Sequence, residues 1–499
     1  QTCALPILGE IIMKLTCNDT LYTYDAYHLL KAFYPDEEIE QQVDEEQESQ
    51  IRIESDCDSC FCVTLAGEKT ELLQMDRGEK KHLAVRSLYE KLCRATKKSL
   101  PWGSLTGVRP TKMLMQKLEE GVPDDRILDW ITKEHFVSGE KAKLGLDIAK
   151  REKRLLSRLD YENGYSLYIG IPFCPTTCSY CSFTSYPISQ YLEKTDAYLE
   201  ALCKELSYIA AVSREKKLNT IYLGGGTPTS LRADQLDRLF THLEKQFSYE
   251  HLLELTVEAG RPDSITREKL KVLKRHGIGR ISVNPQTMQQ KTLDLVGRRH
   301  TVEDVITTFR VARELGFDNI NMDLIAGLPG ETPEDMEDTL TKVQELGPDS
   351  LTVHALAIKR ASRLRQEQRS GEGFTGHTAS AGDLTAMIDA AYRCAGEMGL
   401  VPYYLYRQKN MAGNFENVGY AEVDKAGIYN ILIMEEKQSI VAAGAGASTK
   451  IVLPKAVEMP GSKKHKMTNL IRIENVKQVD EYIARIDEMI ERKGEWLWH

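Results

Sequence analysis

The stretch YIGIPFCPTTCSYCSF, residues 168–183, decides the fold because it joins an apolar, strand-like run to three closely spaced cysteines. Cys174, Cys178 and Cys181 have the spacing C-x₃-C-x₂-C, so three thiolates can surround one soft metal centre from a single loop. Iron–sulfur clusters are held by cysteine thiolates, and a [4Fe–4S] cluster has four irons to ligate. Three cysteines therefore leave one iron open to bind another molecule.

Two other interpretations of this cysteine loop (residues 174–181) are weaker. A structural zinc ion would need a fourth ligand, and the flanking residues offer no obvious one. Three unrelated core cysteines would need a regular buried element, whereas Pro172, Pro175 and the polar Thr176 and Thr177 indicate an irregular loop. We therefore expect a cluster-binding loop.

Composition and charge narrow the class of protein. A chain of 499 residues is too long for one ordinary core, so two or three domains are expected. Its 41% hydrophobic and 28% charged residues are typical of a soluble globular protein, and no apolar run is long enough for a membrane span. The net charge of −9 argues against a nucleic-acid partner. Eleven scattered cysteines favour the reducing cytoplasm over a disulfide-bonded secreted fold.

Changes of pattern along the chain predict five segments. The opening QTCALPI is expected to be a non-native extension that ends before Met13. The expected segments are 1–12, the extension; 13–80, a small α+β module; 81–160, a helical connector; 161–358, an α/β domain with the cluster site; and 359–499, a C-terminal α+β region that covers the substrate. In the last segment, residues 425–434 and 439–448 are expected to pair as strands.

A second group of cysteines lies in the N-terminal module. Cys57, Cys60 and Cys62 fall in an alternating, strand-like stretch. Alternate residues of a strand share a face, so Cys60 and Cys62 point the same way. Spacing alone seldom makes a metal site, and ordinary strand cysteines are the better interpretation.

From residue 165 onwards, strand-like runs and helical patterns alternate six times. Six strands separated by single helical crossovers indicate a parallel sheet with right-handed connections. The predicted fold is therefore an α/β fold built as a partial (β/α)₆ barrel. The carboxyl ends of such strands form the edge where active sites assemble in barrel folds.

Chemically distinctive residues fall at these predicted strand ends. They are the cysteine loop, the run Gly224–Thr229, Glu258, Gln286 and Asp323. Glycines let a backbone approach a ligand closely, but the run fits neither common phosphate-binding loop. Polar residues delivered to one edge by five strands are hard to explain as core packing, so we expect a ligand site there.

The cysteine spacing, with Tyr180 before the last cysteine, resembles the motif of the radical S-adenosylmethionine (SAM) superfamily. The stretches YIGIPFC, GGGTPT, VEAGRPDSIT, NPQTM with GRRHT, and NMDLIAGLPGET resemble the oxygen-independent coproporphyrinogen III oxidases. LPWGSLTGVRPTK and VPYYLYRQKN resemble their HemZ-type branch. The resemblance covers nearly everything after residue 100.

The resemblance implies a radical SAM barrel, a [4Fe–4S] cluster with three cysteine ligands, and SAM on the open iron. Reduction of SAM would give methionine and a 5′-deoxyadenosyl radical that takes a hydrogen atom from a propionate β-carbon. Loss of CO₂ and one electron would leave a vinyl group. Done twice, this would convert coproporphyrinogen III into protoporphyrinogen IX in haem biosynthesis, with a reduced flavodoxin- or ferredoxin-like electron donor.

The resemblance also assigns residues. Tyr168 is carried over as a catalytic residue, and the implied cofactor contacts are Tyr168, Tyr180, Gly225, Gly226, Thr227, Glu258, Gln286, Arg298, Asp323 and Ala357. Arg298 could fork onto a carboxylate. The four carboxylates of the substrate also need cations, and the candidates are Arg299, His300, Lys359, Arg360, Arg407 and Lys409.

Two positions depart from the family pattern. Phe183 stands where coproporphyrinogen oxidases carry a fourth cysteine, and Gly170 stands where they carry a histidine. The phenylalanine is also typical of the related haem chaperones. A haem-binding chaperone and another radical SAM modification of a tetrapyrrole are therefore the alternative functions.

Overall fold

The computed structural model describes residues 13–17, 19–35, 37–43, 51–57, 60–65, 68–73, 77–181, 183–356, 379–407, 415–459 and 467–498. The chain forms two compact units. The first comprises Gln1–Lys150 with Leu405–Asn417, and the second comprises Arg151–Tyr404 with Val418–His499. The five-segment subdivision drawn from the sequence stays a prediction.

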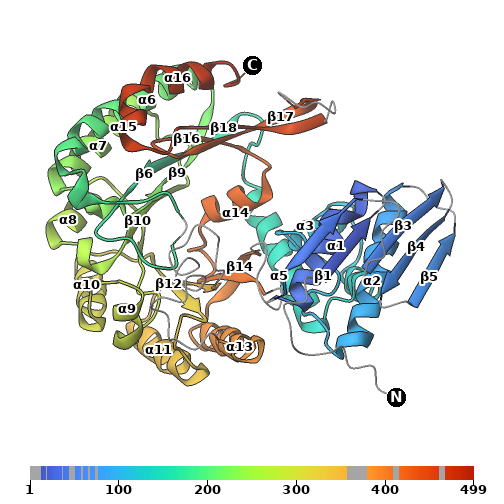
Figure 1. Cartoon of the computed structure of the whole chain (residues 1–499). Coiled ribbons are helices and arrows are strands. Elements are labelled where there is room, and N and C mark those ends of the chain that lie inside the picture. Colours follow the sequence, from blue (N-terminus) through green and yellow to red (C-terminus); the bar gives the residue numbers. More distant parts are fainter. Residues whose placement is uncertain are drawn as a thin grey trace. The chain divides into compact units, whose positions relative to one another are not determined.

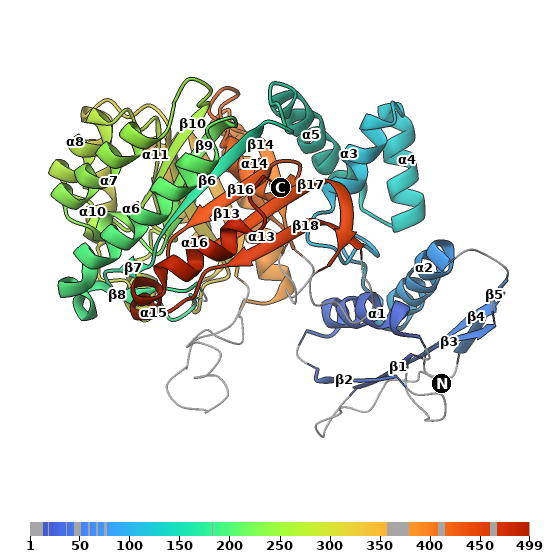
Figure 2. The same ribbon diagram turned by 90° about the horizontal axis from the view of Figure 1, so that it is seen from above.

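The first unit contains a five-stranded sheet in the order β2-β1-β3-β4-β5. Its strands are β1 (Met13–Cys17), β2 (Ile39–Gln42), β3 (Ile51–Cys57), β4 (Cys60–Leu65) and β5 (Glu68–Leu73). Helices α1 (Thr20–Phe33) and α2 (Arg77–Thr96) cover one face of the sheet (Figure 2). Their apolar sides and the strands β1 and β3 bury a common core that includes Leu15, Leu29 and Leu88.

Three more helices belong to this part of the chain, and they are α3 (Thr111–Glu119), α4 (Asp124–His135) and α5 (Gly139–Leu156). Leu105–Gly107, in the turn before α3, is tied to the 405–417 segment, because the buried Arg407 donates to the carbonyl oxygens of Leu105 (2.8 Å) and Gly107. The two stretches that resemble the HemZ-type branch therefore meet.

Six parallel strands form the centre of the second unit, as the sequence predicted. They are β6 (Gly164–Ile171), β9 (Lys217–Gly225), β10 (Glu254–Gly260), β11 (Arg280–Val283), β12 (Ile320–Ala326) and β13 (Ser350–Ala355). The main helices between them are α6 (Thr195–Val212), α7 (Ala233–Gln246), α8 (Arg267–Arg275), α10 (Val302–Glu314) and α11 (Pro333–Leu346). Figure 1 shows these helices as an outer layer around the curved sheet. The predicted α/β fold is confirmed.

Local sequence explains where these helices begin and end. The Thr332 side chain accepts from the Asp335 backbone amide, and the Asp335 side chain accepts from the Thr332 backbone amide. The two bonds form a capping box at the start of α11. Pro333 occupies the first turn, where its missing N–H costs nothing. Gly347 ends α11 in the left-handed conformation, at φ 64°.

C-terminal strands extend the sheet beyond the six central ones. They are β14 (Val401–Tyr406), β15 (Asn417–Ala421), β16 (Ser439–Ala443), β17 (Ser448–Glu458) and β18 (Met467–Glu474). The order is β14-β15-β13-β12-β11-β10-β9-β6-β16-β17-β18, with β16 parallel to β6 and β15 antiparallel to β13. The C-terminal region thus covers both edges of the central sheet.

One sequence expectation is wrong. Residues 428–435 form helix α14 (Ile428–Glu435) and not a strand paired with 439–448. A short apolar run such as IYNILIM fits a buried strand and a buried helix equally well by periodicity. Within the barrel unit, α14 lies on the inner side of the sheet (Figures 1 and 2), where Glu254 accepts hydrogen bonds from the amides of Ile428 and Tyr429.

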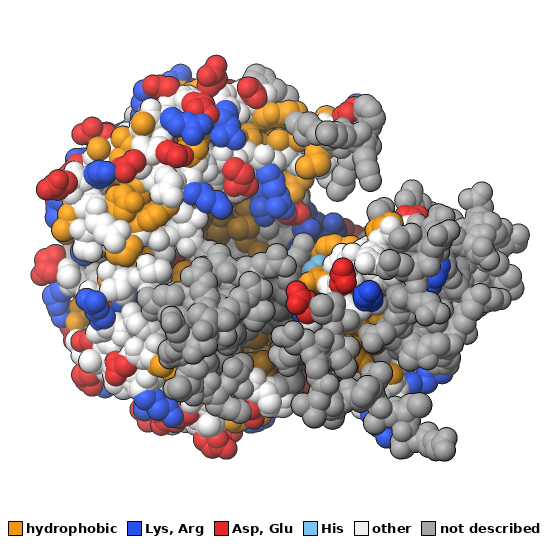
Figure 3. All heavy atoms as spheres, in the orientation of Figure 1, with side chains coloured by type: hydrophobic (Ala, Val, Ile, Leu, Met, Phe, Trp, Pro, Cys, Tyr) orange, Lys and Arg blue, Asp and Glu red, His pale blue; other side chains and the backbone are white. Residues whose placement is uncertain are grey.

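The remaining C-terminal helices are α13 (Ala381–Glu397), α15 (Val479–Ala484) and α16 (Ile486–Gly494). Among the helices described, none is long and apolar enough to cross a bilayer. On the face that Figure 3 shows, acidic and basic side chains are interspersed over the outer helices.

Candidate active site

The cysteine loop leaves the end of β6, makes β7 (Phe173–Cys174) and returns at β8 (Tyr186–Pro187). The Cys181 amide donates to the Cys178 carbonyl at 3.2 Å, which closes the turn between the last two cysteines. Cys174, Cys178 and Cys181 are free thiols, with Cys178 buried and the other two half-buried. All three are therefore available as ligands.

Arg261 supports the loop from the end of β10, and the sequence analysis missed it. Its buried guanidinium donates to the carbonyl oxygen (2.9 Å) and hydroxyl (2.7 Å) of Thr176 and lies 3.8 Å from the Cys178 sulfur. Asp263 fixes it through an ion pair of 2.7 Å. Hydrogen bonds to ligand sulfurs tune iron–sulfur clusters. The sequence signals were its place directly after a strand and within VEAGRPDSIT, a stretch that resembles the family.

The glycine turn after β9 lies directly against the first cysteine. The amides of Gly226 and Thr227 donate to the carbonyl oxygens of Ile171 and Phe173, each at 2.7 Å. The Thr227 hydroxyl lies 3.4 Å from the Cys174 sulfur. A Cβ on Gly226 would come within 2.6 Å of the Phe173 oxygen and 3.0 Å of that sulfur. Glycine is needed here because the two turns approach so closely.

Two carboxylates, Glu258 and Asp323, lie within β10 and β12. The sequence placed both at strand ends, but Asp323 lies in the middle of its strand. Glu258 accepts a hydrogen bond from the Tyr222 hydroxyl. Burial, with the negative charge of Asp323 adding to it, raises the pKa of Glu258 to about 7, against hydrogen bonds from Tyr222 and the Gly225 amide. Asp323 accepts from the Asn321 side-chain amide at 2.7 Å. Asp323 therefore has a hydrogen-bond donor within its own strand.

Gln286 sits on the β11 side of the same edge in a strained conformation, with φ of 69°. Its amide donates to the Asp323 carbonyl at 3.0 Å, and its carbonyl accepts from the Ile325 amide at 2.9 Å. Among the described residues, its buried Oε1 atom has no hydrogen-bond partner, and neither has the Oδ1 atom of Asn284. Unsatisfied buried acceptors are costly unless a ligand supplies donors.

The buried Arg298 side chain connects the cysteine loop to Asn284, the residue directly after β11. Its buried guanidinium donates to the Tyr180 hydroxyl at 3.0 Å and to the Asn284 carbonyl oxygen. The buried Nε has no partner among the described residues, and the expected fork onto a ligand carboxylate stays a prediction. The bond to Tyr180 fixes the residue before the last cysteine.

Three tyrosine rings line the inner side of the sheet near Glu258. Tyr222 stacks on Tyr429 with ring centres 4.4 Å apart, and Tyr168 lies 6.3 Å and 6.2 Å from their respective centres at similar tilt. Tyr168 was expected at the site. Tyr222 and Tyr429 were missed, because both lie in apolar runs that resemble ordinary strands in the sequence.

Of the six side chains predicted to bind the substrate carboxylates, the three that the structure describes differ in burial and in charge. His300 is buried, and burial together with the charge of Arg298 lowers its pKa to about 3. His300 is therefore neutral and not the expected cation. Arg407 bonds to backbone oxygens of the first unit. Arg299 is exposed beside the cysteine loop. Four predicted residues lie outside the described part of the chain: Ala357, Lys359, Arg360 and Lys409.

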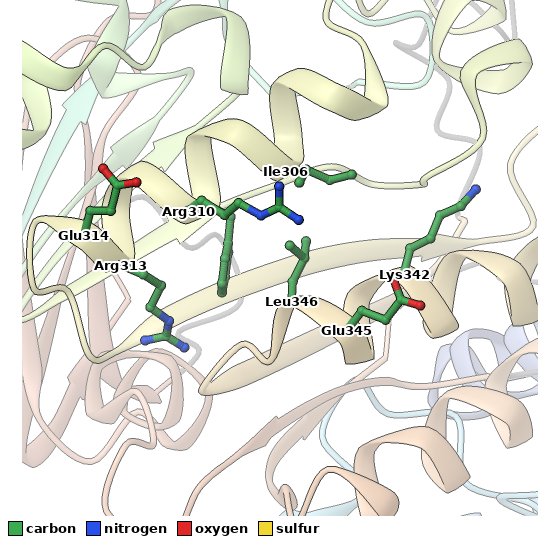
Figure 4. Close-up of a pocket in the computed structure, with 8 residues that line it drawn as sticks. Ile306, Arg310, Arg313, Glu314, Lys342, Glu345 and Leu346 are labelled. Carbon is green, nitrogen blue, oxygen red and sulfur yellow. The ribbon is translucent and has the colours of Figure 1, made fainter.

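A hollow of about 470 Å³ opens at the cysteine loop. It is lined by Thr176, Thr177, Asp294, Gly297, Arg298 and Arg299. A second hollow of about 390 Å³ (Figure 4) is lined by residues from α10 and α11, among them Arg310, Arg313 and Lys342 with Glu314 and Glu345. It lies toward the carboxyl ends of these helices, and helices of such a fold run opposite to the strands. The second hollow therefore belongs to the end of the barrel away from the cysteines.

The residues present fit a [4Fe–4S] cluster and SAM. Three thiols, a glycine turn that a Cβ would fill, and unsatisfied acceptors on Gln286 and Asn284 gather at one edge. Within the described residues, no group of three His, Cys, Asp or Glu side chains is placed for a single metal ion. A cluster does not need such a group, because each thiolate ligates a different iron, whereas a structural zinc ion would.

Comparison with known proteins shows the family to which the chain belongs. Residues 168–343 match the family model of the Radical SAM superfamily. The chain is 42% identical over 355 residues to the oxygen-independent coproporphyrinogen-III oxidase-like protein HemZ of Bacillus subtilis. This match covers 70% of each of the two chains.

Other relatives match over shorter stretches, and the chain spans about half of their length or less. It is 40% identical over 195 residues to the heme chaperone HemW of Bacillus subtilis (39% of this chain, 51% of the relative). It is 35% identical over 192 residues to the oxygen-independent coproporphyrinogen III oxidase of Salmonella typhimurium (38% and 42%). Among solved structures, the radical SAM enzyme coproporphyrinogen III oxidase of Escherichia coli matches with a TM-score of 0.52 and 23% identity, over 66% of this chain and 70% of that one. That likeness concerns the fold.

Proposed function

The chain belongs to the oxygen-independent coproporphyrinogen III oxidase-like family of radical SAM proteins, and we propose that it is a coproporphyrinogen III dehydrogenase. The reaction would convert two propionate side chains into vinyl groups and yield protoporphyrinogen IX. Each conversion removes one hydrogen atom, one CO₂ and one electron from a propionate. The substrate assignment rests on the 42% identity to a coproporphyrinogen oxidase-like protein over most of both chains.

The observation that carries the chemistry is the contact between the cysteine loop and the glycine turn. Cys174, Cys178 and Cys181 would hold the [4Fe–4S] cluster, and with SAM bound the cluster supplies the abstraction of a hydrogen atom. Arg261 holds the loop and donates toward the Cys178 sulfur. Thr227 does the same at Cys174.

The chain's own polar groups would bind and orient SAM. Glu258 and Asp323 can accept from ribose hydroxyls or an ammonium group. Gln286 Oε1 is an unsatisfied acceptor for the same donors. Gly225 and Gly226 have no side chain to keep a ligand away from the backbone, Tyr168 lies beside Gly225, and Ala357 is carried over from the family pattern.

A substrate with four carboxylates needs positive charge near the cysteines. Among the candidate cations in the described part of the chain, Arg299 fits this role because it is exposed beside the cysteine loop. A small one-electron donor such as a reduced flavodoxin or ferredoxin would reduce the cluster. A cluster with an open iron is oxidised readily, so a reducing cytoplasm is the compartment we expect.

The test is an anaerobic assay of the reconstituted protein with coproporphyrinogen III, SAM and a reductant. We expect 5′-deoxyadenosine, methionine and the divinyl product, each measured by mass spectrometry. Cleavage of SAM without any vinyl product would exclude the dehydrogenase and leave another tetrapyrrole modification. The absence of SAM cleavage would exclude the radical chemistry altogether.

A haem chaperone is the second candidate, favoured by the match to HemW and by Phe183, which is 73% exposed next to the last cysteine. This function predicts stoichiometric haem binding with a Soret band and transfer to an acceptor. A histidine ligand at position 170 is excluded because Gly170 has no side chain, and Tyr198 donates to its carbonyl oxygen at 2.6 Å. Haem titration of the same preparation therefore separates the two functions.

A further inference from the structure

Glu258 is held by its neighbours in one orientation. The Tyr222 hydroxyl donates to its Oε1 atom. A Cβ on Gly224 would come within 2.8 Å of its Oε2 atom, so the carboxylate packs against this glycine at the end of β9. The turn and the tyrosine together fix where both oxygens lie.

Tyr222 is itself fixed by the C-terminal region. Its ring packs face to face on Tyr429, at the first turn of α14, with ring centres 4.4 Å apart and a tilt of 19°. Glu254 anchors that turn by accepting from the Tyr429 amide at 3.2 Å. The ring of Tyr222 therefore has little freedom, and its hydroxyl is pre-organised toward Glu258.

We propose that Tyr222 is a positioning residue that keeps the Glu258 carboxylate turned and available as a hydrogen-bond acceptor for SAM. This inference rests on the proposed function, because it takes Glu258 as a contact to SAM. In this proposal Tyr222 and Tyr429 act on the cofactor site indirectly. Their stacked rings hold the Tyr222 hydroxyl in place, and that hydroxyl orients Glu258.

The electrostatics give the proposal a measurable consequence. Burial and Asp323 raise the pKa of Glu258 to about 7, and the bonds from Tyr222 and Gly225 oppose this. The other titratable groups that face it are Tyr168 from β6 and Tyr429 from α14, and burial raises the pKa of both phenols, so they stay neutral. Removal of the Tyr222 hydroxyl should therefore raise the pKa of Glu258 further.

The experiment is equilibrium binding of SAM to the cluster-containing protein between pH 5 and 9, without reductant, so that no turnover contributes. In the native protein, affinity should fall as the pH drops through about 7, because Glu258 becomes protonated. Tyr222→Phe should move this midpoint upward by about one unit, the effect of one hydrogen bond to a charged group. A midpoint equal to that of the native protein overturns the proposal.

Two further variants keep the result specific. Tyr429→Phe is the matched control, because among the described residues Glu258 accepts from Tyr222 and Gly225 and not from Tyr429; its midpoint should stay at the native value. Tyr222→Phe combined with Glu258→Ala should bind no more weakly than Glu258→Ala alone, since Tyr222 acts through the side chain of Glu258. Additive losses in the double variant also overturn the proposal. If the native protein binds no SAM at any pH, the proposed function itself is wrong.

Discussion

Two carboxylates inside the barrel unit, Glu205 and Glu258, have opposite surroundings. Glu205 on α6 is fully buried, and the chain satisfies both of its oxygens. Its donors are the Lys493 ammonium (2.5 Å), the Asn475 side-chain amide (2.9 Å), the Gly444 backbone amide (2.9 Å) and the Tyr482 hydroxyl. Among the described residues, Glu258 accepts from one side chain, that of Tyr222, and from the Gly225 amide, and the negative charge of Asp323 helps to raise its pKa.

The difference separates structure from function. A fully satisfied buried network holds its side chains in one arrangement. The network of Glu205 joins helix α16 to helix α6 through Lys493. An incomplete network with a raised pKa is typical of a binding or catalytic site. Substitutions near Glu205 should therefore reduce stability, and substitutions near Glu258 and the cysteines should reduce function.

The largest expected effect is that of Cys178→Ala, which tests the functional half of this comparison. Loss of a cluster ligand should abolish the visible absorbance of the cluster and SAM cleavage, while the melting temperature of the metal-free protein stays close to native. Cys203→Ala, on α6 away from the loop, is the control and should retain both. Retained SAM cleavage in Cys178→Ala would contradict the assignment of the cluster.

Gly226→Ala should have the next largest effect, because a Cβ there would meet the Phe173 oxygen at 2.6 Å and the Cys174 sulfur at 3.0 Å. The turn or the cysteine must move, so we expect most of the iron to be lost after reconstitution, as measured by iron analysis. Gly279→Ala is the matched control, since nothing lies within 4 Å of its Cβ position. Native iron content in Gly226→Ala would show that the two turns are not as tightly joined as described.

Lys493→Met tests the structural half. Removal of one partner of a buried ion pair leaves a buried charge, which typically costs about 3–5 kcal/mol of unfolding free energy. Lys204→Met is the control, because Lys204 and Asp487 join the same two helices but are 52% and 80% exposed, and such pairs contribute less than about 1 kcal/mol. Denaturant unfolding of both variants gives the comparison. Equal losses would mean that burial of the pair does not matter.

How far the sequence predicts this molecule depends on the range of the contacts. The six strands and the cysteine loop were predictable because their signals are local: apolar runs, helix periodicity and fixed cysteine spacing. Glu258 was predictable from its place near the end of β10, whereas Asp323 lies in the middle of β12. Helix α14 was not, because its apolar run has no distinguishing period.

The missed residues depend on contacts between distant parts of the chain. Arg261 supports Thr176 across two strands, and Tyr222 and Tyr429 meet only when the C-terminal region folds onto the inner side of the sheet. Nothing in the local sequence distinguishes such residues from ordinary strand or helix positions. Arg298 was predicted at the site, but its contacts with Tyr180 and Asn284 could be found only in three dimensions.

The smallest expected effect is the dependence of stability on Glu258, and it tests the comparison without any cofactor chemistry. The pKa of Glu258 is raised from 4.5 to about 7 in the folded protein, mainly by burial. The folded state therefore holds the proton more tightly, so the contribution of Glu258 is fully present below pH 4.5 and is lost as the pH rises through 7. Glu258→Gln does not titrate, so the unfolding free energy of the SAM-free native protein should fall relative to the variant by about 3 kcal/mol between pH 4.5 and 8. If the difference between the two proteins did not change with pH, Glu258 would be as well satisfied as Glu205, and the contrast between the two carboxylates would fail.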